Sequence, residues 1–214
     1  MKAPITAMAV LAAGLAVAAC AGGFKSTEPA PLIYRVTAPE LAGGNELAAD
    51  LLVAVPMTAP GLDNHQIATR WPGLRLDYYA NARWAAPVPD MLQSAVIEAL
   101  QGSRRLRSVQ GHFGGFRATH VLTLEVRRLE ADYTAGAVPV ARVTLAATLG
   151  RQSDRQVLAS WSVATQEQAS ANRLTEVVAA LDAAFDRAAA ELATRTFDAI
   201  GEDLARQPQG PPPR

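Results

Sequence analysis

THVLTLEVRRLE, residues 119–130, alternates apolar and polar side chains, so that Leu122 and Leu124 share one face of an extended chain. A period of two is typical of a β-strand with one face on a hydrophobic core. VARVTLAATLG (140–150) and QVLASWSVAT (156–165) alternate in the same way, and the polar GRQSDR where they meet suits a hairpin turn. Short connections between these amphipathic strands predict an antiparallel meander.

The pattern changes to a helical period on both sides of this meander. Residues 91–100 place their apolar side chains on one helical face, after Pro87 and Pro89 and before Gly102. The segment 170–205 carries a long apolar stripe rich in alanine, which allows close packing of a helix against a sheet. The carboxylates expected largely outside that stripe are Asp182, Asp186, Glu191 and Asp203.

Shorter strands are expected earlier in the chain, at 32–36, at 51–55 before Pro56, and at 74–79. The resulting order is strands, a helix, more strands and a long helix. This order predicts an α+β fold: a single domain with a mostly antiparallel sheet and helices packed on one face.

The first twenty residues have the composition of a bacterial lipoprotein signal. Lys2 precedes an uncharged stretch from Ile5 to Ala19 that is too short and too rich in alanine for a permanent membrane span. Val17, Ala18 and Ala19 then fit a lipobox in front of Cys20, the only cysteine in the chain. We interpret Cys20 as the acylated mature N-terminus, since acyl chains such as palmitate hold a domain on a membrane without a spanning helix. The alternative is an ordinary secretory signal with an incidental cysteine.

These features predict four regions along the chain. They are a signal peptide at 1–19, an acylated flexible tether at 20–31, the α+β domain at 32–206 and a disordered Pro-rich tail at 207–214. Ala21 follows the cysteine in place of the aspartate that favours inner-membrane retention, so the expected location is the periplasmic face of the outer membrane. The 20 basic and 20 acidic residues balance, which argues against a nucleic-acid partner.

Catalytic and metal-binding patterns are weak in this sequence. His65, His112 and His120 lack metal-ligand spacing and are interpreted as surface or hydrogen-bonded core histidines. GHFGG at 111–115 has no helix after it and is interpreted as a bend, while Asp182 and Asp186 fit a solvated helix face. We therefore expect neither a metal nor a cofactor and disfavour an enzyme such as a periplasmic hydrolase.

The segment LDNHQIATRWPGLRLDYYANARWAA, residues 62–86, is the one stretch that points to recognition. It contains Arg-Trp twice, and both residue types are enriched at protein interfaces. The candidate interface residues are Arg70, Trp71, Arg83 and Trp84. The alternative, which the sequence leaves equally open, is that the tryptophans cover the edge of the core and the arginines are solvated or stack on them.

With the lipobox, this segment resembles the ABC-type transport auxiliary lipoprotein family, the PqiC-like proteins. The resemblance covers about Cys20 to Leu106 and rests on short motifs in a fixed order. These are Tyr34-Arg35-Val36, residues 52–56 ending in proline, Leu62 with Gln66-Ile67 and Arg70, Tyr78-Tyr79, Arg83-Trp84-Ala85 with Pro87, and the helix at 91–100.

The resemblance implies a lipid-anchored, non-catalytic accessory that works with an ABC permease, an ATPase and an MCE-type periplasmic protein. Such a system moves lipids or other hydrophobic molecules between the two membranes. The resemblance also implies an α+β domain that can assemble into a homo-oligomeric ring. The competing hypothesis is a structural or assembly lipoprotein of an outer-membrane complex that has no contact with cargo.

Overall fold

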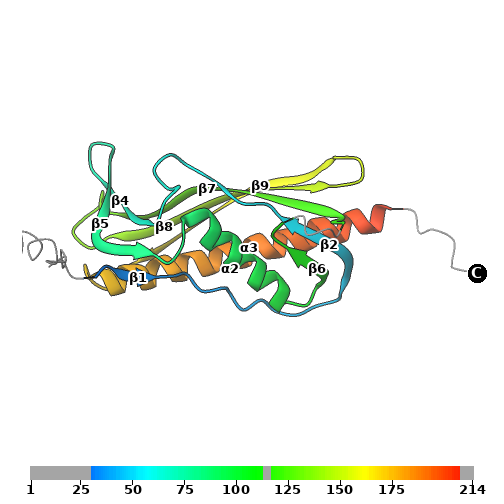
Figure 1. The fold of residues 1–214 in the computed structure, drawn as a ribbon, viewed down its shortest axis with the longest axis horizontal. Helices are drawn as coiled ribbons and strands as arrows, with labels where there is room; N and C mark the ends of the chain where they lie inside the picture. Colours follow the sequence, from blue (N-terminus) through cyan, green and yellow to red (C-terminus); the bar gives the residue numbers. More distant parts are fainter. Residues whose placement is uncertain (1–29, 113–116, 208–214) are drawn as a thin grey trace, which may run out of the picture. The chain divides into compact units, whose positions relative to one another are not determined.

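The computed structural model describes residues 30–112 and 117–207. The predicted signal peptide, Cys20, nearly all of the tether, most of the GHFGG segment and the tail after Gln207 lie outside these residues. Within them, a nine-stranded sheet carries two helices, which gives the expected α+β fold in a single domain (Figure 1).

The predicted meander forms one side of the sheet, with β7 at the centre and β9 at the edge. It consists of β7 (His120–Asp132), β8 (Val140–Arg151) and β9 (Val157–Gln168), and both neighbouring pairs are antiparallel. Leu124 of β7 lies opposite Ala147 of β8, so the apolar positions of the two strands reach the same core. The antiparallel meander predicted from the alternation is therefore confirmed, and its register places the apolar faces of the strands on one core.

The other edge of β7 pairs with three successive short strands, all parallel to it. They are β2 (Leu47–Val53), β3 (Met57–Thr58) and β4 (Gln66–Trp71). Pro56 lies between β2 and β3, where it has no backbone N–H to offer to a ladder. The sheet is thus mixed: its longest pairs are antiparallel, and this broken edge is parallel.

Parallel pairing requires a connection that crosses back over the sheet. That connection starts with β5 (Arg75–Trp84), which forms a hairpin with β4 and also pairs with β1 (Leu32–Tyr34). It continues through α2 (Val88–Gly102) into β6 (Leu106–Gln110), which pairs with β2. The predicted helix at 91–100 is the middle of α2, and Pro87 directly precedes its first residue.

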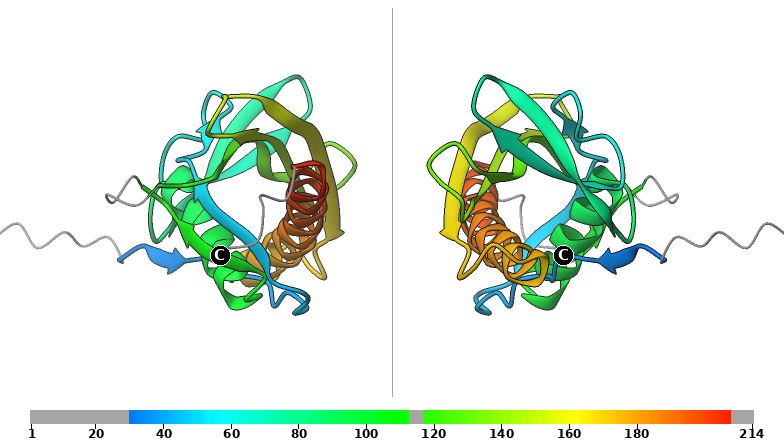
Figure 2. Two further views of the ribbon diagram at one scale, coloured as in Figure 1. Left: turned by 90° about the vertical axis from the view of Figure 1, so that its right-hand side faces the viewer. Right: turned by 90° about the vertical axis from the view of Figure 1, so that its left-hand side faces the viewer.

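Helix α3 (Leu174–Arg206) lies with α2 on one face of the sheet, and the strands curve around it (Figure 2). Ala184, Phe185 and Ala188 of α3 are completely buried, and the alanines allow the helix backbone to approach the strands closely. No helix in the described part of the chain is both long and apolar enough to cross a membrane.

Candidate functional site

The segment predicted to carry recognition, residues 62–86, forms mainly the β4–β5 hairpin. Its tip is the three-residue loop Pro72 to Leu74, since Trp71 pairs with Arg75. Gly73 and Leu74 both have positive φ, at 76° and 64°. A positive φ is ordinary for glycine but rare for leucine. Leu74 is also 92% exposed.

Trp71 is held at the base of this tip by contacts within the domain. Its indole stacks on Tyr133 with ring centroids 4.4 Å apart and an interplanar angle of 3°, and the Arg75 guanidinium lies 5.0 Å from its centroid. The Trp71 Nε1 donates a hydrogen bond to Thr69 Oγ1 at 3.0 Å. Trp71 is therefore a half-buried, fixed side chain that leaves part of its surface accessible.

Tyr133 connects this stack to the start of α3. Its hydroxyl lies 2.5 Å from the Tyr79 hydroxyl and donates to Asn172 Oδ1 at 2.8 Å. Burial, together with the hydrogen bond to Tyr133, raises the pKa of Tyr79 above its ordinary value. Sequence pattern does not link Tyr133 or Asn172 to the hairpin, because both lie far from it along the chain.

Arg70 lies on the opposite face of β4 from Trp71, as successive residues of a strand do. Its guanidinium is 3.9 Å from Glu130, a carboxylate that is 4.0 Å from Arg128 and only 8% exposed. Burial raises the pKa of Glu130. Arg70 thus balances a buried charge, and its side chain remains one-third exposed.

The second Arg-Trp pair is divided between surface and core. Trp84 is 1% exposed and packs among the core residues, while its neighbour Arg83 is exposed. Adjacent strand residues point to opposite faces, which explains the division. The predicted interface role therefore does not extend to the Trp84 side chain, because no partner can reach it in the folded domain. Trp84 is part of the core itself, whereas the alternative had placed both tryptophans at the edge of the core.

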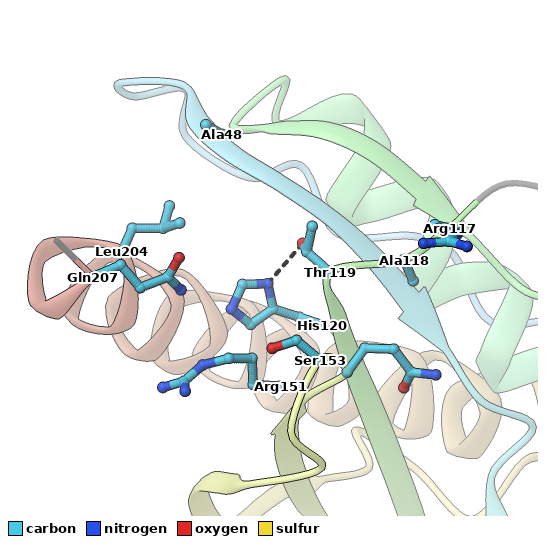
Figure 3. A pocket seen from close by; sticks show the side chains of 10 residues that line it. Ala48, Arg117, Ala118, Thr119, His120, Arg151, Ser153, Leu204 and Gln207 are labelled. Atoms are coloured by element: carbon cyan, nitrogen blue, oxygen red, sulfur yellow. Dashed lines mark hydrogen bonds between the residues drawn. The ribbon is translucent and has the colours of Figure 1, made fainter. Parts of the chain in front are cut away.

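At the other end of the sheet lies a cavity of about 610 Å³ (Figure 3). Its walls come from β2, the start of β7, the end of β8 and the last turn of α3. Apolar lining from Ala48, Ala118 and Leu204 is combined with two arginines, Arg117 and Arg151. The remaining lining residues are Thr119, His120, Gln152, Ser153 and Gln207.

A buried charged network forms one wall of this cavity. His120 Nε2 lies 3.2 Å from Asp203 Oδ2, and both side chains are 1% exposed. Asp203 also accepts hydrogen bonds from Arg151 Nε at 3.2 Å and from Gln207 Nε2 at 2.8 Å. The Arg151 hydrogen bond, followed by those from His120 and Gln207, outweighs burial and lowers the pKa of Asp203 to about 2.

This network corrects one expectation and confirms another. Asp203 was expected largely outside the apolar stripe of the long helix, yet it is buried, because Arg151 compensates its charge and His120 hydrogen-bonds to it. His120 is a hydrogen-bonded core histidine, one of the two interpretations given for it: its Nδ1 lies 2.9 Å from Thr119 Oγ1.

The polar groups of this network hydrogen-bond to one another, and these bonds attach the last turn of α3 to the sheet. Asp203 accepts hydrogen bonds from Arg151, His120 and Gln207, and its lowered pKa makes it a weak base at neutral pH. Among residues 30–112 and 117–207, no three His, Cys, Asp or Glu side chains gather in a way that could hold a metal ion.

Comparison with known proteins decides the family. Residues 34–193 match the family model described as ABC-type transport auxiliary lipoprotein component. The chain belongs to this family. The auxiliary lipoprotein match includes the whole β4–β5 hairpin as well as His120 and Arg151, and it ends before Asp203. It confirms the resemblance seen in the sequence and makes the protein a lipoprotein component that is auxiliary to ABC-type transport.

Solved structures support the assignment of this auxiliary lipoprotein. A protein of Xanthomonas campestris assigned to family DUF330 has 30% sequence identity and a TM-score of 0.73, over 81% of this chain and 99% of its own. An uncharacterized protein with 15% identity has a TM-score of 0.62, over 78% of this chain and 99% of its own, and shows the fold alone. A search of the curated proteins finds no match.

Proposed function

We propose that the protein is a periplasm-facing accessory lipoprotein of the outer membrane, anchored through acylated Cys20. In this role it works with an ABC permease, an ATPase and an MCE-type periplasmic protein to move lipids or other hydrophobic molecules between the membranes, without catalysis of its own. The observation that carries the proposal is the family match over 34–193. The lipobox ending at Cys20 and the following Ala21 support the anchor and its membrane.

Partner recognition is proposed for the side chains of the hairpin that remain accessible. Arg83 is exposed on β5, Arg70 is one-third exposed on β4, and Trp71 presents part of a rigid indole. Arginine binds carboxylates through several donors, and a fixed aromatic ring loses little conformational entropy on binding. These properties suit a surface that docks the MCE-type protein or another copy of this chain in a ring.

The anchor is tested by Cys20→Ser in the full chain. Without the thiol, acylation cannot occur, so the variant should be uncleaved or mislocalised on membrane fractionation. Normal recovery of the mature form in the outer membrane would contradict the lipoprotein assignment.

The transport role is tested by crosslinking in cells, followed by purification of the acylated protein. Recovery of the MCE-type protein with the permease and ATPase supports the proposal. Recovery of outer-membrane assembly proteins alone would favour the alternative, a structural or assembly lipoprotein without contact with cargo.

A further inference from the structure

The tip of the β4–β5 hairpin has a property that folding does not require. Leu74 is 92% exposed, more than any other large apolar side chain among the described residues. It also adopts a φ of +64°, which glycine or asparagine adopts far more readily than leucine. The domain therefore gains neither burial nor a favoured backbone conformation from a leucine at this position.

The residues around Leu74 have the chemistry of a membrane–water interface. From Trp71 to Leu76 the chain contains Arg75 and no acidic residue. Leu76 adds an apolar side chain that is 41% exposed, and Trp71 stands at the base of the tip. Leucine favours the acyl region, arginine pairs with lipid phosphate, and tryptophan favours the headgroup layer.

The length of the tether allows this tip to reach a bilayer. Leu32 of β1 pairs with Ala82 of β5, eight residues after Leu74. At the rise of a strand, the tip therefore lies within about 30 Å of the point where the domain begins. The twelve peptide units from Cys20 to Leu32 span at most about 40 Å, so a lipid anchor on Cys20 allows the tip to touch the membrane.

We infer that the β4–β5 hairpin tip inserts Leu74 into the surface of the phospholipid bilayer that holds the lipid anchor, with Arg75 at the headgroup phosphates. This inference rests on the proposed anchor at Cys20. The contact fixes the orientation of the domain on the membrane and directs the cavity at the opposite end of the sheet away from the lipid.

The test uses the acylated protein in vesicles of phosphatidylethanolamine and phosphatidylglycerol that contain a nitroxide-labelled lipid. Because Cys20 is the only cysteine and acylation occupies its thiol, Leu74→Cys provides a single reactive thiol for an environment-sensitive fluorophore. Val157→Cys is the matched control, since Val157 is an apolar residue that is 61% exposed at the start of β9, at the other end of the sheet. We expect a blue shift and loss of fluorescence at position 74, and water-like, unquenched emission at position 157.

A second variant separates insertion from folding. With the fluorophore on Leu76→Cys, adding Leu74→Gly should reduce the quenching by lipid, while the melting temperature stays the same or rises, because glycine tolerates the positive φ. Val157→Gly should leave the quenching at position 76 unchanged.

The outcomes distinguish the contact from the anchor. If the protein floats with the vesicles but position 74 is as exposed to water as position 157, the bilayer contact is wrong and the anchor stands. Protection at position 74 that follows protein density in the vesicles, without quenching by lipid, indicates a protein partner and also overturns the inference. If the labelled protein does not float with vesicles, the proposed anchor fails, and the contact fails with it.

Discussion

At the cavity end of the sheet, Asp203 is 1% exposed and is bonded by Arg151, His120 and Gln207. At the hairpin end, Leu74 is 92% exposed and Arg83 lies on the surface. At the first end, the buried charge is paired with groups of the same chain. At the second end, apolar and cationic side chains are exposed to solvent. Exposed side chains that the fold does not need are the reason for proposing recognition at the hairpin end, whereas the satisfied buried network indicates structural support at the other end.

The sharpest contrast within the hairpin is between its two tryptophans. Trp84→Ala should cost about 3–5 kcal/mol of unfolding free energy, as large-to-small substitutions in a core do. Trp71→Ala should cost less, about 1–2 kcal/mol, because the half-buried ring loses mainly its stacking on Tyr133. Urea denaturation of both variants measures the difference. Equal losses would mean that the base of the hairpin is as much part of the core as Trp84.

The cavity end is tested by removing its central carboxylate. Asp203→Ala leaves His120 and Arg151 without their shared acceptor and should destabilise the domain by about 3 kcal/mol. Asp198→Ala, at an exposed position of the same helix, is the matched control and should stay within about 0.5 kcal/mol of the parent. A melting temperature unchanged by Asp203→Ala would show that the network does not support the fold.

The same carboxylate predicts a pH dependence. Its pKa is lowered from 3.8 to about 2, so its contribution to stability is present above pH 4 and is lost as the pH falls through about 2. The shift corresponds to about 2 kcal/mol. Because the comparison with Asp203→Asn cancels the other carboxylates, the stability difference between the two proteins should shrink over this pH range. A difference that is constant with pH would contradict the lowered pKa.

The smallest effect on folding is expected for Arg83→Glu, which should change stability by no more than about 0.5 kcal/mol. If Arg83 contacts a partner as proposed, binding of that partner should weaken by about tenfold or more. Arg155→Glu, on the exposed β8–β9 turn at the cavity end, serves as the control. Partner pulldown with melting curves checks both quantities, and equal binding by the two variants would remove Arg83 from the interface.

Local pattern was sufficient for much of this fold. Alternation in 119–130, 140–150 and 156–165 predicted β7, β8 and β9 and their antiparallel order, and the helical period with Pro87 predicted α2. The parallel pairs of β7 with β2, β3 and β4 were missed, because parallel neighbours are joined by long connections that leave no turn motif in the sequence.

Residue type and spacing alone pointed to the hairpin as the candidate site and to the family, whose motifs are short and local. Only the tertiary structure divided the two Arg-Trp pairs and brought Asp203 to His120 across 83 positions of the chain. The physical reason is that periodicity specifies which face of an element is apolar, whereas burial of an individual charge or ring depends on what a distant segment supplies against it. Arg151 pairs with the charge of Asp203, and the apolar side chains of the core surround the ring of Trp84.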